Sequence, residues 1–236
     1  MLVLSICDFF NCLSTNFKTL NLDHEKPVIF RLLFVKFIAK SLSFYCDSPM
    51  RKIFPFTQVL QDDVVRLRLM RDSDNNAFSA IAFESSIWTY FYANITDELA
   101  LKNWVQVAVF DHMNKMRVPF TIELKASNKV VGSTSFDNIS ERDSRLEIGW
   151  TWLGTDFQKV GINRRVKVLL LNFAFETLKM ERVEFKTDAL NEGSRKALLG
   201  IGAKEEGILR SHSLMPNNRR RDTVYFSILK KEWLER

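Results

Sequence analysis

The chain has 236 residues, of which 46% are hydrophobic and 26% charged, as is usual for a soluble globular domain with one sizeable core. The net charge of +6 favours an anionic partner. Basic residues are interleaved with acidic ones, however, so we expect no direct binding of nucleic acid. The three cysteines show neither metal-ligand spacing nor a disulfide framework, which argues against a metal site and predicts a reducing compartment, the cytoplasm.

Residues 1–49 differ in composition from the rest of the chain. They hold all three cysteines and no glycine, whereas all eight glycines lie between Gly132 and Gly207. No positive charge precedes the apolar residues 2–7, which argues against a secretory signal. The apolar stretch 28–44 is too short and too charged for a transmembrane segment. We expect an atypical extension here, either an amphipathic helix or a segment upstream of a true start at Met50, with residues 50–236 forming the domain.

From residue 64 onward the apolar pattern predicts strands and helices in an α+β order. Period-two alternation predicts strands, at residues 64–69, 118–125, 129–136, 145–153, 183–188, 207–213 and 223–229. Helical spacing predicts helices, at residues 73–85, 97–111, 163–179 and 194–201. Gly202 fits the left-handed position that ends the last helix. This order predicts one mixed, mostly antiparallel sheet flanked by helices.

Several side chains carry expectations of their own. In the helix 97–111, one apolar face is expected to comprise Leu99, Trp104, Val107 and Ala108. Trp150 and Trp152 share one face of a strand and are expected to pack. Residues 219–221 are three arginines in the turn before the last strand. They are expected at a solvated hairpin tip, with contact to an acidic substrate or to a phosphate as the alternative.

The loop between the strand 145–153 and the helix 163–179 carries residues suited to a diphosphate. The first backbone N–H groups of a helix have no partner within it, and the helix dipole favours negative charge there. Gly161 would let phosphate oxygens approach these groups without a β-carbon in the way. Asn163 would cap the helix, and Arg164 and Arg165 would add positive charge. An ordinary strand-to-helix turn with one glycine is the alternative.

Four segments in this order resemble the GNAT superfamily of acyl-CoA N-acyltransferases, in particular its RimJ/RimL branch. They are residues 130–135, 146–153, 158–163 and 191–194. The family signature is Gln/Arg-x-x-Gly-x-Gly/Ala, which reads here as Gln158-Lys159-Val160-Gly161-Ile162-Asn163 and departs from the pattern at its last position. The resemblance covers roughly residues 63–233. It implies that the loop and Arg164 bind the pyrophosphate of acetyl-CoA, and that no metal takes part.

The resemblance also implies a cleft for the cofactor. The ends of the strands 145–153 and 183–188 would splay apart and hold the pantetheine arm between them. Backbone groups of Trp152 and Leu153 would pair with the arm like an added strand, and the N–H group near Leu153 would polarise the thioester carbonyl. Asn191 would bond the arm from the other side. Plain helix capping is the alternative for Asn191 and Ser194.

Acetyl transfer to an amine needs a base, and a proton for the departing thiolate. Glu147 is the expected base, acting directly or through a water molecule, with a solvated or salt-bridged strand residue as the alternative. Many members of this family carry a tyrosine in the helix after the fifth strand, but residues 191–201 contain none. Ser194 is therefore the candidate hydrogen-bond donor to the sulfur.

The resemblance implies an N-acetyltransferase that uses acetyl-CoA to modify a primary amine. The expected acceptor is a protein N-terminal or side-chain amine. A small amine, such as a polyamine, an aminoglycoside or an amino acid, is the alternative within the enzyme class. A non-catalytic acyl-CoA-binding module is the alternative outside it. Either a monomer or a homodimer is expected.

Overall fold

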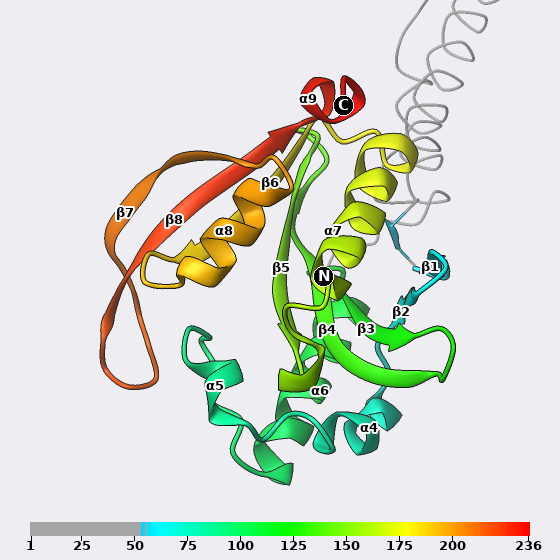
Figure 1. Ribbon diagram of the computed structural model, residues 1–236, viewed down its shortest axis with the longest axis vertical. Coiled ribbons are helices and arrows are strands. Elements are labelled where there is room, and N and C mark those ends of the chain that lie inside the picture. The colour runs from blue at the N-terminus through cyan, green and yellow to red at the C-terminus, as the bar shows by residue number, and fades with distance from the viewer. Residues whose placement is uncertain (1–52, 55) are drawn as a thin grey trace, which may run out of the picture. The chain divides into compact units, whose positions relative to one another are not determined.

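The computed structural model describes residues 53–54 and 56–236 (Figure 1), so the expectations about residues 1–49 and Met50 lie outside the described residues. Eight strands form one sheet in the order β1-β2-β3-β4-β5-β6-β8-β7. The strands are β1 Leu60–Gln61, β2 Val65–Leu69, β3 Val118–Leu124, β4 Lys129–Ser140, β5 Arg145–Leu153, β6 Arg182–Asp188, β7 Lys204–Leu214 and β8 Arg220–Leu229.

The helices lie in the connections between strands. Four follow β2: η2 Asp72–Asp74, α4 Asn75–Ser79, α5 Ser85–Trp88 and α6 Glu98–Met113. Three follow β5: η3 Thr155–Phe157, α7 Ile162–Asn172 and the π-helical turn η4 Phe173–Thr177. The last two are α8 Glu192–Gly200, after β6, and α9 Lys230–Leu234, after β8. The α+β class and the mixed, mostly antiparallel sheet flanked by helices are confirmed.

The β5–β6 pair is the one parallel neighbour in the sheet, and it is short. Arg145, Leu146 and Glu147 pair with Arg182, Val183 and Glu184, and no further residues of the two strands pair. Beyond this point the two strands diverge (Figure 1), while β6 stays paired with β8 along its whole length. We call residues 148–153 of β5 and 185–188 of β6, which do not pair with each other, the splay.

A β-bulge in β5 lies directly beside the splay. Ser135 pairs with Gly149 and Ser133 with Trp152, so β5 holds one residue more than β4 between these pairs. Trp150, inside the bulge, has a positive φ of 54°. A bulge bends its strand and increases the local twist. It thereby helps turn the end of β5 away from the direction of β6.

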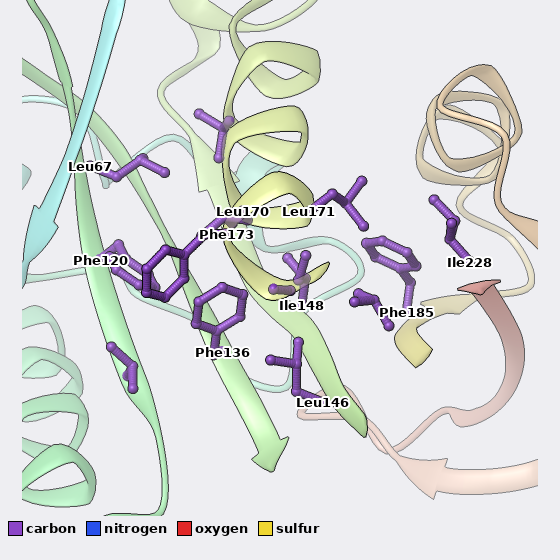
Figure 2. Packing of buried hydrophobic residues seen from close by; sticks show 14 of the residues in the cluster. Leu67, Phe120, Phe136, Leu146, Ile148, Leu170, Leu171, Phe173, Phe185 and Ile228 are labelled. Atoms are coloured by element: carbon purple, nitrogen blue, oxygen red, sulfur yellow. The ribbon is translucent and has the colours of Figure 1, made fainter. Parts of the chain in front are cut away.

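Two apolar cores cover the sheet. The α7-side core holds Leu146, Ile148, Leu170 and Phe173 among others, and Figure 2 shows the helix residues lying over those of β5. The α6-side core contains Trp152, whose ring centroid lies 5.3 Å from that of Phe78 and 5.2 Å from that of Trp88. Neighbouring residues of a strand point to opposite faces. Because Leu153 belongs to the α7-side core and Trp152 to the other, the two cores lie on opposite faces.

Two helix predictions were wrong in part. The predicted helix 73–85 is shorter than expected, since η2 and α4 end at Ser79 and residues 80–84 are not helical. The buried Asp74 carboxylate, which accepts hydrogen bonds from Arg68 and Thr121, ties the start of this segment to the sheet. In α6, Leu99 is 68% and Val107 56% exposed, so the predicted apolar face is wrong for these two, while Trp104 and Ala108 do face the core. The buried positions of α6 are Leu101, Val105 and Ala108.

Gly132 of β4 lies where the backbone of β5 leaves no room for a side chain. A β-carbon there would lie 2.1 Å from the carbonyl oxygen of Trp152 and 2.9 Å from Cα of Leu153. These are backbone atoms of a paired strand, so they cannot move aside without disturbing the ladder. The sequence at this position is therefore restricted to glycine by the shape of the bulged strand.

We expect Gly132→Ala to lower the free energy of unfolding by roughly 2 kcal/mol, the usual scale of overpacking. Gly200→Ala is the matched control, because a β-carbon at Gly200 would meet no atom within 4 Å and alanine suits a helix better. Urea unfolding of both variants measures the difference. Equal effects at the two positions would show that the close approach of β4 and β5 carries no strain.

Candidate functional site

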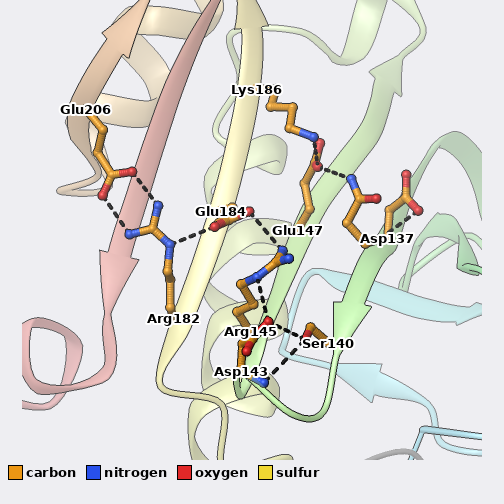
Figure 3. Close-up of polar contacts among 10 residues, drawn as sticks. Asp137, Ser140, Asp143, Arg145, Glu147, Arg182, Glu184, Lys186 and Glu206 are labelled. Atoms are coloured by element: carbon orange, nitrogen blue, oxygen red, sulfur yellow. Dashed lines mark hydrogen bonds and ion pairs between the residues drawn. The ribbon is translucent and has the colours of Figure 1, made fainter.

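Glu147 lies at the point where β5 and β6 part. Its neighbours Leu146 and Ile148 belong to the α7-side core, so its side chain points to the opposite face of the sheet. Oε2 accepts a hydrogen bond from Asn138 Nδ2 at 2.6 Å and lies 2.7 Å from Lys186 Nζ (Figure 3). Asn138 reaches it from a second irregularity, in β4, where its φ is 46°.

Lys186 of β6 joins the two strands through this carboxylate. Burial acts to lower the pKa of Lys186, but the hydrogen bond and the charge of Glu147 outweigh it and raise the pKa above its ordinary value. The ammonium group therefore stays charged at neutral pH. The structure thus shows Glu147 as a salt-bridged residue, which was the alternative interpretation. Its Oε1 accepts no hydrogen bond from residues 53–54 and 56–236.

A second set of charges holds the paired end of the two strands together. Arg182 Nε donates to Glu184 Oε1 at 2.7 Å, and the Arg182 guanidinium also pairs with Glu206 of β7 (Figure 3). Arg145 of β5 reaches Glu184 at 3.4 Å. These ion pairs connect β5, β6 and β7 at the end away from the splay. They hold the strands together there while the other end stays parted.

The start of α7 leaves backbone N–H groups without partners in the helix. The first bond across the helix start runs from Arg165 N–H to the Gly161 carbonyl. Gly161, and not the predicted Asn163, is the N-cap residue, so that part of the prediction was wrong. Gly161 has a left-handed φ of 89°, and a β-carbon there would meet no atom within 4 Å. The glycine is thus required by the turn, and the space beside it is open.

The predicted loop residues divide into two groups. Lys159, Val160 and Gly161 are exposed, and Ile162 packs into the α7-side core. The Gln158 side chain donates from Nε2 to the Leu153 carbonyl at 2.9 Å, so it ties the loop to the end of β5. Its amide is used in holding the loop's shape.

Leu153, and not Trp152, presents its backbone to the splay. Gly154 N–H donates to the Val131 carbonyl of β4 at 3.0 Å. Backbone groups alternate in direction along a strand, so the N–H group of Leu153 points away from β4. Trp152 pairs with Ser133 of β4 and places its indole in the α6-side core. The prediction that Trp152 packs is confirmed, and its backbone faces β4.

The two arginines after the loop differ in their surroundings. Arg165 Nη1 lies 2.9 Å from Asp62 and 2.7 Å from Asp63, so its charge is compensated near β1 and β2. Arg164 is exposed and lines a pocket of about 400 Å³ with Trp233 of α9 and other residues of α7 and α9. Of the two, Arg164 and not Arg165 is available to an anionic ligand.

Asn191 caps α8, as its alternative interpretation held. Its Oδ1 accepts a hydrogen bond from the Ser194 backbone N–H at 3.0 Å. The amide nitrogen of Asn191 makes no hydrogen bond within the part of the chain that the structure describes. Ser194 is half-buried in the first turn of α8. At the other end Gly202 adopts a left-handed φ of 79°, which confirms the predicted helix end.

Of the three arginines at residues 219–221, Arg221 is buried, so the prediction of a solvated tip was wrong for it, while Arg219 is half-buried and paired. Arg219 pairs with the buried carboxylate of Asp188, the last residue of β6. Arg221 is buried and its guanidinium lies 4.7 Å from the ring centroid of Tyr92. Tyr92 follows α5, so this contact links the β7–β8 hairpin to the segment after β2. Neither contact can be read from a local sequence pattern, because both join distant segments.

Lys167 is the residue of this site that sequence reasoning missed. It lies on α7, and its neighbours at helical spacing, Leu170, Leu171 and Ala174, are all buried. Its Nζ donates to Thr151 Oγ1 of β5 at 2.8 Å. Burial lowers the pKa of Lys167 to about 7, and the negative charge of Glu147 acts in the opposite direction. The sequence signal that could have identified Lys167 is a single lysine within an otherwise apolar stripe of the helix.

Among residues 53–54 and 56–236, no group of three or more histidine, cysteine, aspartate or glutamate side chains is placed to hold a metal ion. Within the same ranges, no helix is both long and apolar enough to cross a membrane.

Known proteins resemble this chain in sequence. Residues 65–204 match the family described as Acetyltransferase (GNAT) domain. The chain is 36% identical over 102 residues to "Putative ribosomal N-acetyltransferase YdaF" of Bacillus subtilis (strain 168). This alignment covers 43% of this chain and 55% of that protein. The chain is 24% identical over 173 residues to "Uncharacterized N-acetyltransferase YoaA" of the same organism, covering 73% of this chain and 97% of that protein.

A solved structure agrees in fold. The "Crystal structure of putative acetyltransferase from T. thermophilus" superposes with a TM-score of 0.70 and 31% identity, covering 77% of this chain and 94% of that one. The overall fold is thus shared with a protein described as an acetyltransferase. The chain belongs to the GNAT acetyltransferase family, since the family match spans more than half of it. Its alignment spans just over half the length of YdaF.

The lowered pKa of Lys167 predicts how stability depends on pH. Between about 7 and the ordinary value of 10.5, the unfolded chain binds a proton that the folded chain does not. The free energy of unfolding therefore rises with pH in this window because of Lys167. We expect the stability of wild type relative to Lys167→Met to rise by up to about 1.4 kcal/mol per pH unit across this window. Urea unfolding at several pH values measures it, and a difference that stays constant would contradict the buried amine.

Proposed function

We propose that the protein is an N-acetyltransferase that moves the acetyl group of acetyl-CoA to a primary amine. The observation that carries the proposal is the splay, which lies beside the free N–H groups at the start of α7. An extended arm can pair with a strand edge that the splay leaves open, and a diphosphate suits a helix start. Membership of the GNAT family supports the same activity.

Each part of the cofactor has a matching feature in this proposal. The pyrophosphate lies at the exposed turn of Lys159, Val160 and Gly161, against the N–H groups of Ile162, Asn163 and Arg164, with the charge of the Arg164 side chain nearby. The pantetheine arm pairs with the outward backbone of Leu153, whose N–H also polarises the thioester carbonyl. On the other side, the amide nitrogen of Asn191 donates to the arm. Gln158 and Trp152 support this site by holding the loop and the bulged strand.

Glu147 is the base in this proposal. The Glu147 side chain lies at the start of the splay and points to the face of the sheet opposite α7. Its Oε2 is held by Asn138 and Lys186. A fixed carboxylate with a second oxygen that has no donor among residues 53–54 and 56–236 can accept a proton from an amine, directly or through a water molecule. Ser194 remains a candidate donor of a hydrogen bond to the sulfur.

The proposed acceptor is a protein amine. The name of YdaF, which is 36% identical over the aligned residues, refers to ribosomal acetylation. A ribosomal acceptor would place the reaction in the cytoplasm, as the cysteine usage also predicts. A small amine as acceptor, or a module that binds acyl-CoA without transfer, are the competing functions.

The proposed function is tested by thiol release from acetyl-CoA with a panel of amines. The panel contains peptides with a free N-terminus, ribosomal proteins, polyamines, aminoglycosides and amino acids. We expect turnover with peptides or ribosomal proteins. Turnover with a small amine alone would change the substrate class, and binding of coenzyme A without turnover on any amine would favour the non-catalytic module.

Calorimetry with coenzyme A tests the cofactor site separately. Gly161→Val forces a β-branched residue into a left-handed turn and places methyl groups beside the helix start. We expect at least about tenfold weaker binding, or about 1.4 kcal/mol. Thermal unfolding of the variant controls for loss of the fold. Unchanged affinity would move the phosphate site elsewhere.

We expect Glu147→Gln to lower turnover by about 10² or more, because the amide cannot accept the amine's proton. Lys186→Met is the matched control, since it breaks the same ion pair but keeps the carboxylate. Steady-state kinetics with an active amine from the panel measure both variants. A loss of equal size in the two variants would assign the effect to the ion pair and remove Glu147 from the role of base.

A further inference from the structure

The amine of Lys167 lies between the parted strands on the α7 side. Nζ donates to Thr151 Oγ1 of β5 at 2.8 Å and lies 5.5 Å from the ring centroid of Phe185 of β6. Thr151 and Phe185 both belong to the splay, beyond the last paired residues Glu147 and Glu184. The side chain of Lys167 is only 6% exposed. A long helix side chain thus brings an ammonium group into the region between two strands that no hydrogen bond joins.

Structural stability alone does not explain a lysine at this place. Burying a charged amine costs free energy unless it is paired. Within the described ranges 53–54 and 56–236, no carboxylate lies within ion-pair distance of Lys167, and its acceptor is a neutral hydroxyl. The adjacent buried positions of the helix are filled by leucine and alanine. A costly group that the packing does not require is a candidate for function.

Glu147 and Lys167 approach the splay from opposite faces of the sheet. Figure 2 shows Leu146 and Ile148 beneath α7, so Glu147 between them points to the other face, where it meets Lys186 of β6. Thr151 follows the bulge, and its hydroxyl also bonds Thr134 of β4 at 2.8 Å. The Glu147 carboxylate, itself paired with Lys186, carries the charge that acts on the Lys167 amine. The negative charge of Glu147 favours the protonated amine.

We propose that Lys167 is a further catalytic residue, which donates a proton to the sulfur of coenzyme A as the thioester breaks. The proposal rests on the proposed acetyl transfer. The amine nitrogen attacks the carbonyl carbon and loses a proton to Glu147. The carbon–sulfur bond then breaks, its electron pair goes to sulfur, and an N–H proton of Lys167 completes the thiol. Before the next cycle Glu147 releases its proton to water and Lys167 takes up a proton from water, so both groups return to their starting states.

The charge and position of Lys167 suit this step better than Ser194 does. A serine hydroxyl does not release a proton near neutral pH, whereas Lys167 has a pKa of about 7 and exchanges its proton there. Before the proton moves, the ammonium also stabilises the negative charge that develops on sulfur. This would explain how the site works although α8 carries no tyrosine.

The direct test is a titration of the thiol of bound coenzyme A, followed by the ultraviolet absorbance of the thiolate. It needs no acceptor amine and uses the full chain. The thiolate and the ammonium of Lys167 stabilise each other, so the thiolate also raises the pKa of Lys167 and keeps the amine charged while the thiol ionises. With Lys167 present, we therefore expect the bound thiol to ionise at least about one pH unit lower than in Lys167→Met, a tenfold difference in thiolate. Lys179→Met, which removes an exposed lysine near the end of the same helical segment, is the charge-matched control and should behave as wild type.

The outcomes separate this inference from the proposed function. If coenzyme A binds and its thiol ionises alike in wild type and Lys167→Met, the amine does not face the sulfur and the inference is overturned alone. If coenzyme A does not bind at all, the proposed function fails, and the inference fails with it. A shift that Lys179→Met removes as well would reflect net charge, and would also overturn the inference.

Kinetics with an active amine distinguish proton donation from a merely structural role. We expect Lys167→Met to lower kcat by about 10² while coenzyme A affinity stays within a few fold. Lys167→Arg keeps a positive charge but holds its protons near neutral pH, so it should not restore turnover. The fall in wild-type kcat at high pH should be absent in Lys167→Met. Full activity of Lys167→Arg would show that charge alone suffices and would overturn proton donation.

Discussion

The ion pair between Glu147 and Lys186 is the interaction on which the site depends, because it crosses from β5 to β6 where their hydrogen bonds end. Parallel strands normally stay together by a continuous ladder, and here the ladder covers three residue pairs. Both charges are largely withdrawn from solvent. Removing one partner would therefore leave an uncompensated charge, which costs more than the pair itself contributes. The ion pair fixes the point of divergence and positions the carboxylate at the same time.

The divergence of β5 and β6 arises because each strand is paired with a different neighbour on its other side. β6 is paired with β8 over seven residues, so its direction is set by that neighbour. β5 is bent by the bulge at Trp150, which the close approach at Gly132 locks in place. The two strands thus follow different partners beyond Glu147. The carbonyl of Leu153 is bonded by Gln158, but its N–H group points away from β4 into the splay, and a buried N–H group requires an acceptor.

The sequence was sufficient for the regular parts of this fold. Alternation identified the long strands, and Gly161 and Gly202 marked a helix start and a helix end, because local conformation alone requires glycine there. The bulge at Trp150 was not predictable, since it arises from pairing with β4. The burial of Arg221 under contact with Tyr92 depends on segments far apart in the chain. Periodicity predicts which face of a helix or strand is apolar. It does not predict which polar side chain will be buried by a segment that is distant in the sequence.

Lys167 shows how this limit bears on function. A helical stripe that buries Leu170, Leu171 and Ala174 predicts an apolar residue at position 167, and the lysine there is locally inconsistent. The structure resolves the inconsistency by placing the amine between the strands, on the face opposite the Glu147 carboxylate. In the proposed reaction Glu147 accepts the proton of the incoming amine from one side of the sheet. Lys167 donates a proton to the departing sulfur from the other side. The parted strands allow both groups to reach one bond, which a continuous ladder between β5 and β6 would prevent.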